Sequence, residues 1–127
     1  MAVAGIGTDL SRAARFEKFL AAGKEGVLLR LFTAGERSYA LAKRQPAPHL
    51  AARFAAKEAF LKALGLGLRD GITWHDMEVV RDELGAPSLQ LTGRASEIVA
   101  ERGITRVHLS YSHDGDYSMA MVVLEGR

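Results

Sequence analysis

The stretch that decides the fold is residues 50–64, LAARFAAKEAFLKAL. Eleven of these fifteen residues are Ala, Leu or Phe. A helix that is apolar nearly all round is a buried helix, so we expect one over residues 49–64 at the centre of the molecule. One side of this helix carries only small residues, which suits close packing on a sheet: Ala52, Ala55, Ala56, Ala59 and Ala63. The four charged residues, which need partners if buried, are Arg53, Lys57, Glu58 and Lys62.

Shorter elements are expected on both sides of this helix. Residues 107–112 and 117–124 alternate apolar and polar side chains around Asp114-Gly115, which predicts a β-hairpin. Thr33 and Glu36 have the spacing of a capping box, which marks a helix start. The other expected elements are strands over 2–7, 74–81 and 87–91 and helices over 12–20, 24–31 and 92–102. The predicted class is α+β, with a mainly antiparallel sheet packed around a buried central helix.

Length and composition limit the possible functions. With 127 residues, 48% of them hydrophobic, the chain is predicted to form a single domain over residues 1–127. It contains no Cys, which excludes thiolate nucleophiles and Cys-bound zinc and suits a reducing compartment, the cytoplasm. No apolar run is long enough to span a bilayer, so we expect no membrane association. A domain of this size has little material to enclose a large substrate, which is expected to need a second subunit.

Positive charge is concentrated in the middle of the chain. The net charge is only +2, which argues against a general polyanion binder, and we expect no nucleic-acid partner. Residues 43–69 nevertheless contain six basic side chains and one acid, Glu58. A basic block in a balanced chain predicts a local anion site, with phosphate as the ligand.

Two carboxylates are candidate metal ligands. Asp9 follows the expected first strand, where it either binds a metal or only caps the next helix. Glu58 lies among the three cations of the central helix, and the simplest alternative is an exposed ion pair with Lys62, worth about 0.2–0.5 kcal/mol. Because that helix is so apolar, we favour a site that holds a metal ion and phosphates. Mg²⁺ is commonly bound by one or two carboxylates together with substrate phosphates. The spacing alone leaves open whether Asp9 and Glu58 meet.

A third polar cluster is Ser110-Tyr-Ser-His-Asp114, at the end of an expected strand. Alternation places His113 at the rim of a core-facing row, either as a structural residue or as a donor to a phosphate oxygen. Asp114 is expected to be a turn residue. A Ser-His-Asp triad is not expected, because these residues are adjacent in sequence and no nucleophile elbow accompanies them.

Three segments, in this order, resemble those of a known family. They are Gly5-Ile-Gly-Thr-Asp-Leu10 with Arg15 six residues after Asp9, Arg53-Phe-Ala-Ala-Lys-Glu-Ala-Phe-Leu-Lys-Ala-Leu-Gly65, and Ser110-Tyr-Ser-His113. Over nearly the whole chain they are similar to the bacterial holo-acyl-carrier-protein synthases, which are small, typically trimeric 4′-phosphopantetheinyl transferases. The resemblance implies that fold, and Mg²⁺-dependent transfer of the phosphopantetheine arm of coenzyme A to a serine of an apo acyl carrier protein. Adenosine 3′,5′-bisphosphate would be released, and the reaction would serve fatty acid biosynthesis.

The resemblance also implies a role for each candidate residue. Asp9 and Glu58 would hold Mg²⁺ on the pyrophosphate of coenzyme A, and Glu58 or a water bound to the metal would accept the serine proton. The contacts to coenzyme A phosphates would come from Arg53, Lys57, Lys62 and His113. The Gly65 turn would lie near the nucleotide, and Arg15 would meet the acidic recognition helix of the carrier protein. In a homotrimer with clefts between subunits, His113 of one chain would serve the Asp9 and Glu58 of the next.

The sequence leaves two other functions open. A small acyltransferase or thioesterase acting on coenzyme A esters could use the same cationic cleft without a metal. A non-enzymatic module could instead bind an acidic protein or RNA through residues 43–69. Stacking on single-stranded bases needs aromatic side chains. The only ones in that block are Phe54 and Phe60, both expected in the core, which argues against binding of single-stranded RNA.

Overall fold

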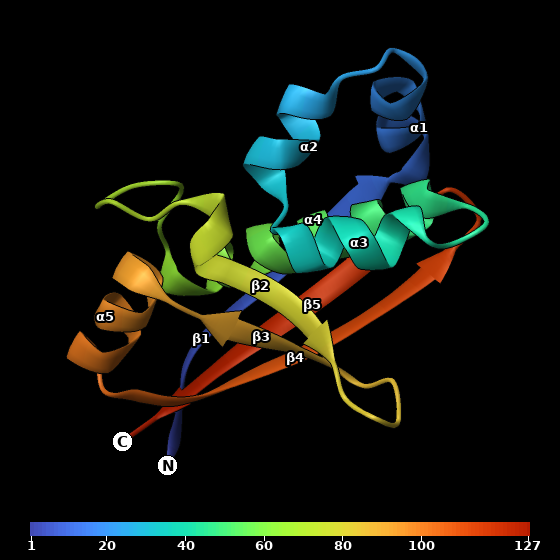
Figure 1. Ribbon diagram of the computed structural model, residues 1–127. Helices are drawn as coiled ribbons and strands as arrows, with labels where there is room; N and C mark the ends of the chain where they lie inside the picture. The colour runs from blue at the N-terminus through green and yellow to red at the C-terminus, as the bar shows by residue number, and fades with distance from the viewer.

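The computed structural model describes all residues, 1–127 (Figure 1). Its helices are α1 (Ala13–Ala21), α2 (Glu25–Leu31), α3 (Ala34–Leu41), α4 (Pro46–Leu64) and α5 (Gly93–Glu101), with one 3-10 helix, η1 (Trp74–Asp76). Its strands are β1 (Ala2–Arg12), β2 (Met77–Arg81), β3 (Pro87–Leu91), β4 (Ile104–Asp114) and β5 (Tyr117–Gly126). The predicted α+β class is confirmed.

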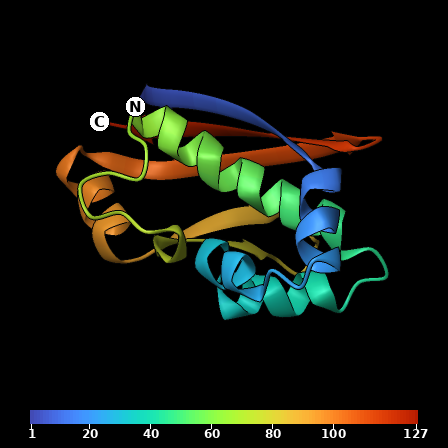
Figure 2. The ribbon, with the colours of Figure 1, turned by 90° about the horizontal axis from the view of Figure 1, so that it is seen from above.

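Helix α4 lies between two layers. On one side is an antiparallel sheet with the strand order β1-β5-β4. On the other side are α2, α3 and the antiparallel hairpin β2–β3, as the view in Figure 2 shows. Fourteen of the nineteen residues of α4 are buried, so the predicted central helix is confirmed. Neither this helix nor a shorter one has the combination of length and apolar composition that crossing a membrane requires.

The hydrophobic core has two parts that meet along α4. One part fills the space between α4, the three-stranded sheet, β2 and α5, and includes Phe60 and Val122. The other lies under α1, α2 and α3 and includes Phe16, Phe32 and Phe54. Full burial of a side chain of this kind contributes about 1.5–3 kcal/mol. The two parts together fix α4 relative to both layers.

Strand β1 is longer than expected, and this changes the position of Asp9. The strand continues to Arg12, so Asp9 lies inside it, opposite Ala120 of β5. The residue that precedes α1 is Arg12, and the helix start is capped from elsewhere: the amide of Ala14 donates to Oδ1 of Asp116, 2.9 Å away in the β4–β5 turn. The interpretation of Asp9 as a helix cap is therefore wrong.

Other boundaries also differ from the sequence expectation, and the hairpin strands expected over 107–112 and 117–124 are longer, at Ile104–Asp114 and Tyr117–Gly126. Helix α4 begins at Pro46, where proline suits the first turn because that position needs no amide hydrogen. The strand expected from residue 74 begins only at Met77, because Trp74–Asp76 form the 3-10 turn. The capping box of Thr33 and Glu36 is present as predicted.

Candidate active site

Two glycines allow β1 to lie directly on α4. A Cβ atom added to Gly5 would come within 2.1 Å of the carbonyl oxygen of Ala63, and one added to Gly7 within 2.1 Å of that of Ala59. Any side chain at either position would overlap the helix backbone, so only glycine permits this approach. Alternate residues of a strand share a face. Asp9, two residues after Gly7, therefore faces the same helix.

Asp9 meets the last two turns of α4. The Nζ of Lys62 donates to Oδ1 of Asp9 at 2.9 Å, with the side chain of Asp9 mostly buried and that of Lys62 half-exposed. Glu58, one turn earlier, is partly buried. Burial raises the pKa of Glu58, the negative charge of Asp9 raises it further, and the positive charges of Lys62 and Arg15 oppose the shift. The two carboxylates are thus near enough for their charges to interact.

This donor set fits a magnesium ion. Nowhere in the chain do three or more His, Asp or Glu side chains form a group that could hold a metal. Within one chain, Asp9 and Glu58 are therefore the two carboxylates available to an ion bound here. Mg²⁺ suits such a site, because it commonly takes one or two carboxylates and completes its shell with phosphate oxygens and water.

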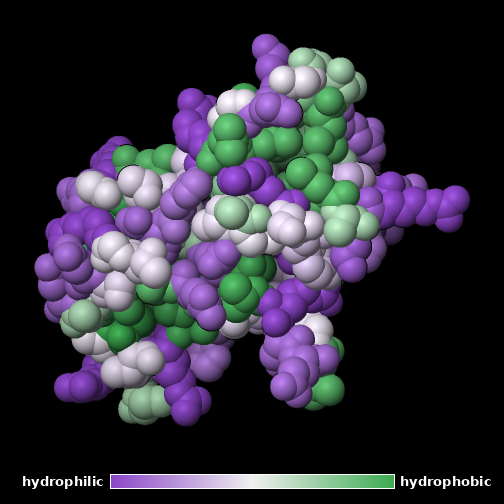
Figure 3. Space-filling view, viewed as in Figure 1, coloured by the Kyte–Doolittle hydropathy of each residue, from purple (hydrophilic) through white to green (hydrophobic).

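Glu58 also lines a cleft between α1, α2, η1 and α4, which we call the apolar cleft. Its volume is about 1000 Å³, seven of its twelve lining residues are hydrophobic, and Glu58 is its only acid. Hydrophobic side chains gather over α1 and α2 on the face shown in Figure 3. The guanidinium of Arg15 lies 5.0 Å from the ring centroid of Phe54 and lines this cleft too. Arg15 is therefore both exposed on α1 and close to the candidate catalytic carboxylate.

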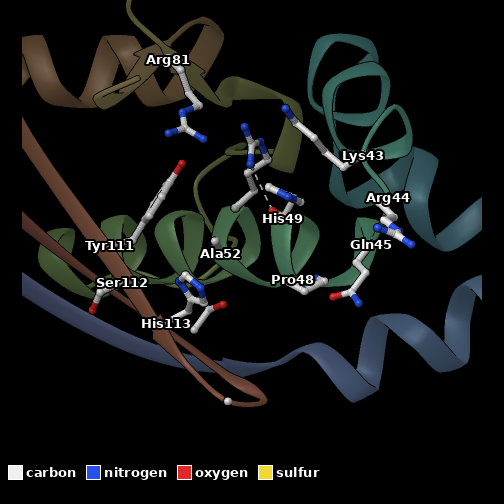
Figure 4. A pocket seen from close by; sticks show the side chains of 13 residues that line it. Lys43, Arg44, Gln45, Pro48, His49, Ala52, Arg81, Tyr111, Ser112 and His113 are labelled. Atoms are coloured by element: carbon white, nitrogen blue, oxygen red, sulfur yellow. Dashed lines mark hydrogen bonds between the residues drawn. The ribbon is translucent and has the colours of Figure 1, made fainter. Parts of the chain in front are cut away.

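A second cleft lies between the α3–α4 connection, the first half of α4, β2 and the β4–β5 hairpin. Its volume is about 750 Å³, and Figure 4 shows Tyr111 and His113 reaching into it from β4. It has no acidic lining residue but six basic ones: Lys43, Arg44, His49, Arg53, Arg81 and His113. We call it the cationic cleft. Its size is within the range of ligand pockets, and its charge suits phosphates.

Arg53 is the most deeply buried cation of the cationic cleft, with 2% of its surface exposed. Its Nη1 donates to the carbonyl oxygen of His49 at 3.2 Å, and its guanidinium lies 4.2 Å from the ring centroid of Tyr39. Its Nε has no hydrogen-bond partner. Because buried donors are nearly always paired, a free guanidinium donor at this position indicates an anionic ligand.

Tyr39 organises the cations on one wall of the cationic cleft. The Nη1 of Arg81 donates to the Tyr39 hydroxyl at 2.6 Å, and the Nζ of Lys43 lies 4.5 Å from the ring centroid. Burial alone would raise the pKa of Tyr39, but the charges of Arg81 and Lys43 help to lower it overall. Burial lowers the pKa of His49, and the neighbouring cations lower it further. An anion in the cleft would relieve this repulsion.

Lys57 is not exposed to either cleft. Its side chain is fully buried, and its Nζ donates to Oε1 of Glu36 at 2.6 Å and to the carbonyl oxygens of Leu31 at 2.7 Å and Trp74 at 3.1 Å. An ammonium group has three hydrogens, so none is left for a phosphate. Burial lowers the pKa of Lys57, and the charge of Glu36 opposes that shift. We therefore correct the expected phosphate contact of Lys57 to a place in a buried ion pair.

The two clefts lie on different sides of α4. His49 and Glu58 are nine residues apart, which turns the side chain by about 180° and moves it about 14 Å along the helix. On the sheet, β5 separates Asp9 on β1 from His113 on β4. The expected site residues thus form two groups in one chain: Asp9, Glu58 and Lys62 in one, and Arg53 and His113 in the other.

Comparison with known proteins decides the family. Residues 5–122 match the 4′-phosphopantetheinyl transferase superfamily. The holo-[acyl-carrier-protein] synthase of Syntrophotalea carbinolica is 60% identical, over 98% of this chain and 97% of its own length. That of Geobacter metallireducens is 51% identical, over 95% and 96%. The chain belongs to the holo-acyl-carrier-protein synthase family.

Solved structures agree with this assignment. The holo-acyl-carrier-protein synthase of Neisseria meningitidis has a TM-score of 0.89 and 35% identity, covering 98% of this chain and 99% of its own. That of Bacillus anthracis, solved in complex with CoA (3′,5′-ADP), has a TM-score of 0.80 and 34% identity, covering 98% of each chain. A third, from Helicobacter pylori, was solved with coenzyme A, with a TM-score of 0.82 and 29% identity, covering 94% and 99%. The transferase class and fold implied by the resemblance are confirmed.

Sequence reasoning did not single out four members of the cationic cleft. They are Lys43, Arg44, His49 and Arg81. Lys43 and Arg44 belong to the basic block of residues 43–69, but Arg81 lies outside it. Only the folding of β2 over α4 brings Arg81 to the same cleft as Arg53. The Gly65 turn is left-handed, with φ 75°, and lines neither cleft.

Proposed function

We propose that this member of the family transfers the 4′-phosphopantetheine arm of coenzyme A to a serine of an apo acyl carrier protein and releases adenosine 3′,5′-bisphosphate. The observation that carries the proposal is that β1 brings the carboxylate of Asp9 to the side of α4 that carries Glu58 and Lys62, where it bonds to Lys62 and its charge acts on Glu58. Relatives that share most of its sequence are synthases of holo-acyl-carrier protein, and two structural neighbours were solved with coenzyme A. Residues 1–127 would act as one transferase domain.

The chemistry is a substitution at phosphorus. The serine oxygen forms a bond to the phosphorus that carries the pantetheine arm, and the bond from that phosphorus to the bridging oxygen of the pyrophosphate breaks. Adenosine 3′,5′-bisphosphate leaves with the electron pair, and the serine proton passes to Glu58 or to water. Such transfers depend on positioning and charge stabilisation more than on covalent chemistry by the protein. The ammonium of Lys62 would offset negative charge beside the reacting group.

Asp9 and Glu58 are the residues that would hold Mg²⁺. When bound, the ion neutralises charge on the pyrophosphate. Burial raises the pKa of Glu58 and the negative charge of Asp9 raises it further, so a bound cation would stabilise the charged form of Glu58.

The cationic cleft is the proposed site for the phosphates of coenzyme A. Arg53 offers an unpaired buried Nε there, and His113 reaches in from β4. Lys62 would contact the same molecule from the carboxylate side. The apolar cleft, which leads to Glu58, suits the less polar pantetheine arm.

We propose a homotrimer with an active site at each subunit interface. A single chain places His113 and Glu58 on different sides of α4, so an active site that uses both draws them from two chains. The face of β1 and β5 turned away from α4 also exposes large apolar side chains: Ile6 60%, Leu10 65% and Met119 37%. An exposed apolar sheet face of this kind is typical of a contact between subunits.

Arg15 is the proposed contact for the acidic recognition helix of the carrier protein. Its exposure on α1, beside the apolar cleft, would bring the carrier serine towards Glu58. The substrate would be a carrier protein of fatty acid or polyketide synthesis in the cytoplasm. No nucleic-acid or membrane partner is proposed.

Mass spectrometry of an apo acyl carrier protein incubated with the enzyme, coenzyme A and Mg²⁺ tests the proposal. We expect a mass gain of one phosphopantetheine, which EDTA abolishes and added Mg²⁺ restores. An acyl mass gain from acyl-coenzyme A that survives EDTA would indicate a metal-free acyltransferase. No gain under any condition would contradict a transferase function.

A further inference from the structure

We infer that Lys57 is a positioning residue that sets the width of the apolar cleft beside Glu58, through its bonds to the backbones of two cleft walls. The inference rests on the proposed function, because it assigns Lys57 a part in the same reaction. It also replaces the phosphate contact that the resemblance implied for this lysine.

The bonds of Lys57 reach residues of both walls. The Nζ of Lys57 donates to the carbonyl oxygen of Leu31, at the end of α2, and to that of Trp74, at the start of η1. Leu31 and Trp74 both line the apolar cleft, as does Glu58, the residue that follows Lys57 on α4. One ammonium group therefore joins two walls to the helix that carries the candidate catalytic carboxylate.

Glu36 gives this ammonium group a fixed anchor. Its Oε1 accepts from Lys57 at 2.6 Å and from the amide of Thr33 at 2.9 Å, and its Oε2 accepts from the amide of Val79 at 2.8 Å. Glu36 is 1% exposed, and its bonds tie α3 and β2 to the same point. The position of the ammonium is therefore set by two elements that are not part of the cleft.

A buried ion pair is a costly way to stabilise a fold, since apolar residues of similar volume often do as well. Its advantage here is geometric. Carbonyl oxygens can be held by a donor only at hydrogen-bond distance, so Lys57 keeps Leu31 and Trp74 at defined places. A methionine could fill the same volume, but the carbonyl groups of Leu31 and Trp74 would lose their hydrogen bonds to residue 57.

The test compares Lys57→Met with the double variant Lys57→Met/Glu36→Gln. The single variant leaves Glu36 charged and buried without its partner, so its Tm should fall clearly. The double variant removes that charge, and its Tm should recover most of the loss. We expect its kcat for transfer to stay about 10- to 100-fold below that of the unmodified enzyme, because small displacements of the groups around a reacting centre have effects of this size. Its KM for coenzyme A should stay within twofold.

The fluorescence of Trp74 provides a second measurement that does not depend on enzyme activity. Trp74 is the only tryptophan of the chain, and its ring lies 5.4 Å from that of Phe54. Its fluorescence should shift to longer wavelength in the double variant as the wall moves. The inference is overturned if kcat recovers together with Tm, which indicates a purely structural pair. It is also overturned by a tenfold rise in the Kd of adenosine 3′,5′-bisphosphate, which indicates a phosphate contact, or by unchanged fluorescence. If the unmodified enzyme transfers nothing, the proposed function fails, while the fluorescence still tests the role of Lys57.

Discussion

The two sides of α4 differ in charge and in the way their residues are held. On one side, Asp9 and Glu58 lie near a largely apolar cleft. On the other, six basic side chains line a cleft that has no acid. The first side has the two carboxylates proposed to hold a cation, with Lys62 and Arg15 beside them, and the second has basic side chains and no carboxylate. The proposed transfer uses both sides, the carboxylates for Mg²⁺ and the basic side chains for the phosphates of coenzyme A.

The two sides also differ in the contacts that position their residues. The carboxylate side depends on backbone contact, since Gly5 and Gly7 rest directly on the carbonyl groups of α4. The cationic side depends on long side chains stacked around Tyr39. The proposed metal ligands are thus positioned by backbone packing of β1 on α4, and the proposed phosphate contacts mainly by contacts between side chains.

The largest expected effect comes from Glu58→Gln. The amide has the size of the carboxylate but no negative charge for a metal, so kcat should fall by about 10²- to 10³-fold. Tm should be unchanged or higher, because burial of this carboxylate is unfavourable. The control is Glu83→Gln at the exposed β2–β3 turn, which should retain full activity. Loss of folding with Glu58→Gln would instead support a structural ion pair with Lys62.

Mixing two inactive variants tests whether the two sides come from different chains. Glu58→Gln and His113→Ala, co-expressed with different tags and purified as mixed trimers, should regain about one third of full activity, because each mixed closed ring of three has one interface that combines both intact residues. Native mass spectrometry would confirm that the chains mix. If each active site lies within one chain, the mixed oligomers would show only the sum of the two residual activities.

The comparison also shows what the sequence could predict. The composition of residues 50–64 was sufficient for a buried central helix, and the alanine side lies on the sheet as expected. Lys57 and Lys62, however, flank the same glutamate and look alike in sequence. The difference comes from their partners in the fold. Lys57 forms a buried ion pair with Glu36 of α3, whereas Lys62 bonds to Asp9 of β1. Periodicity reports which side of a helix is buried, but not what lies against it.

Gly7→Ala is expected to have an intermediate effect on the carboxylate side. The new methyl group would lie 2.1 Å from the carbonyl oxygen of Ala59, so β1 must move away from α4 and take Asp9 with it. Overpacking of this kind costs about 1–3 kcal/mol, measured by urea unfolding, and kcat should fall with it. Gly26→Ala is the matched control: that position has open space and lies in α2, where alanine should stabilise by about 0.5–1 kcal/mol. Equal effects of the two variants would contradict the backbone contact.

The smallest effect concerns the cationic side and is a shift in titration. Burial and nearby cations lower the pKa of His49 below its usual value of about 6.5, so its imidazole should titrate at a lower pH than a free histidine in NMR spectra. Bound phosphates add negative charge and should raise that pKa. Binding then takes up protons, so the affinity for adenosine 3′,5′-bisphosphate should rise as the pH falls from about 7 to 6.

Arg53→Met removes one of the cations and should raise the pKa of His49 in the free enzyme. If adenosine 3′,5′-bisphosphate leaves the titration of His49 unchanged, the phosphates bind outside the cationic cleft. The assignment of phosphate binding to this side of α4 is then wrong.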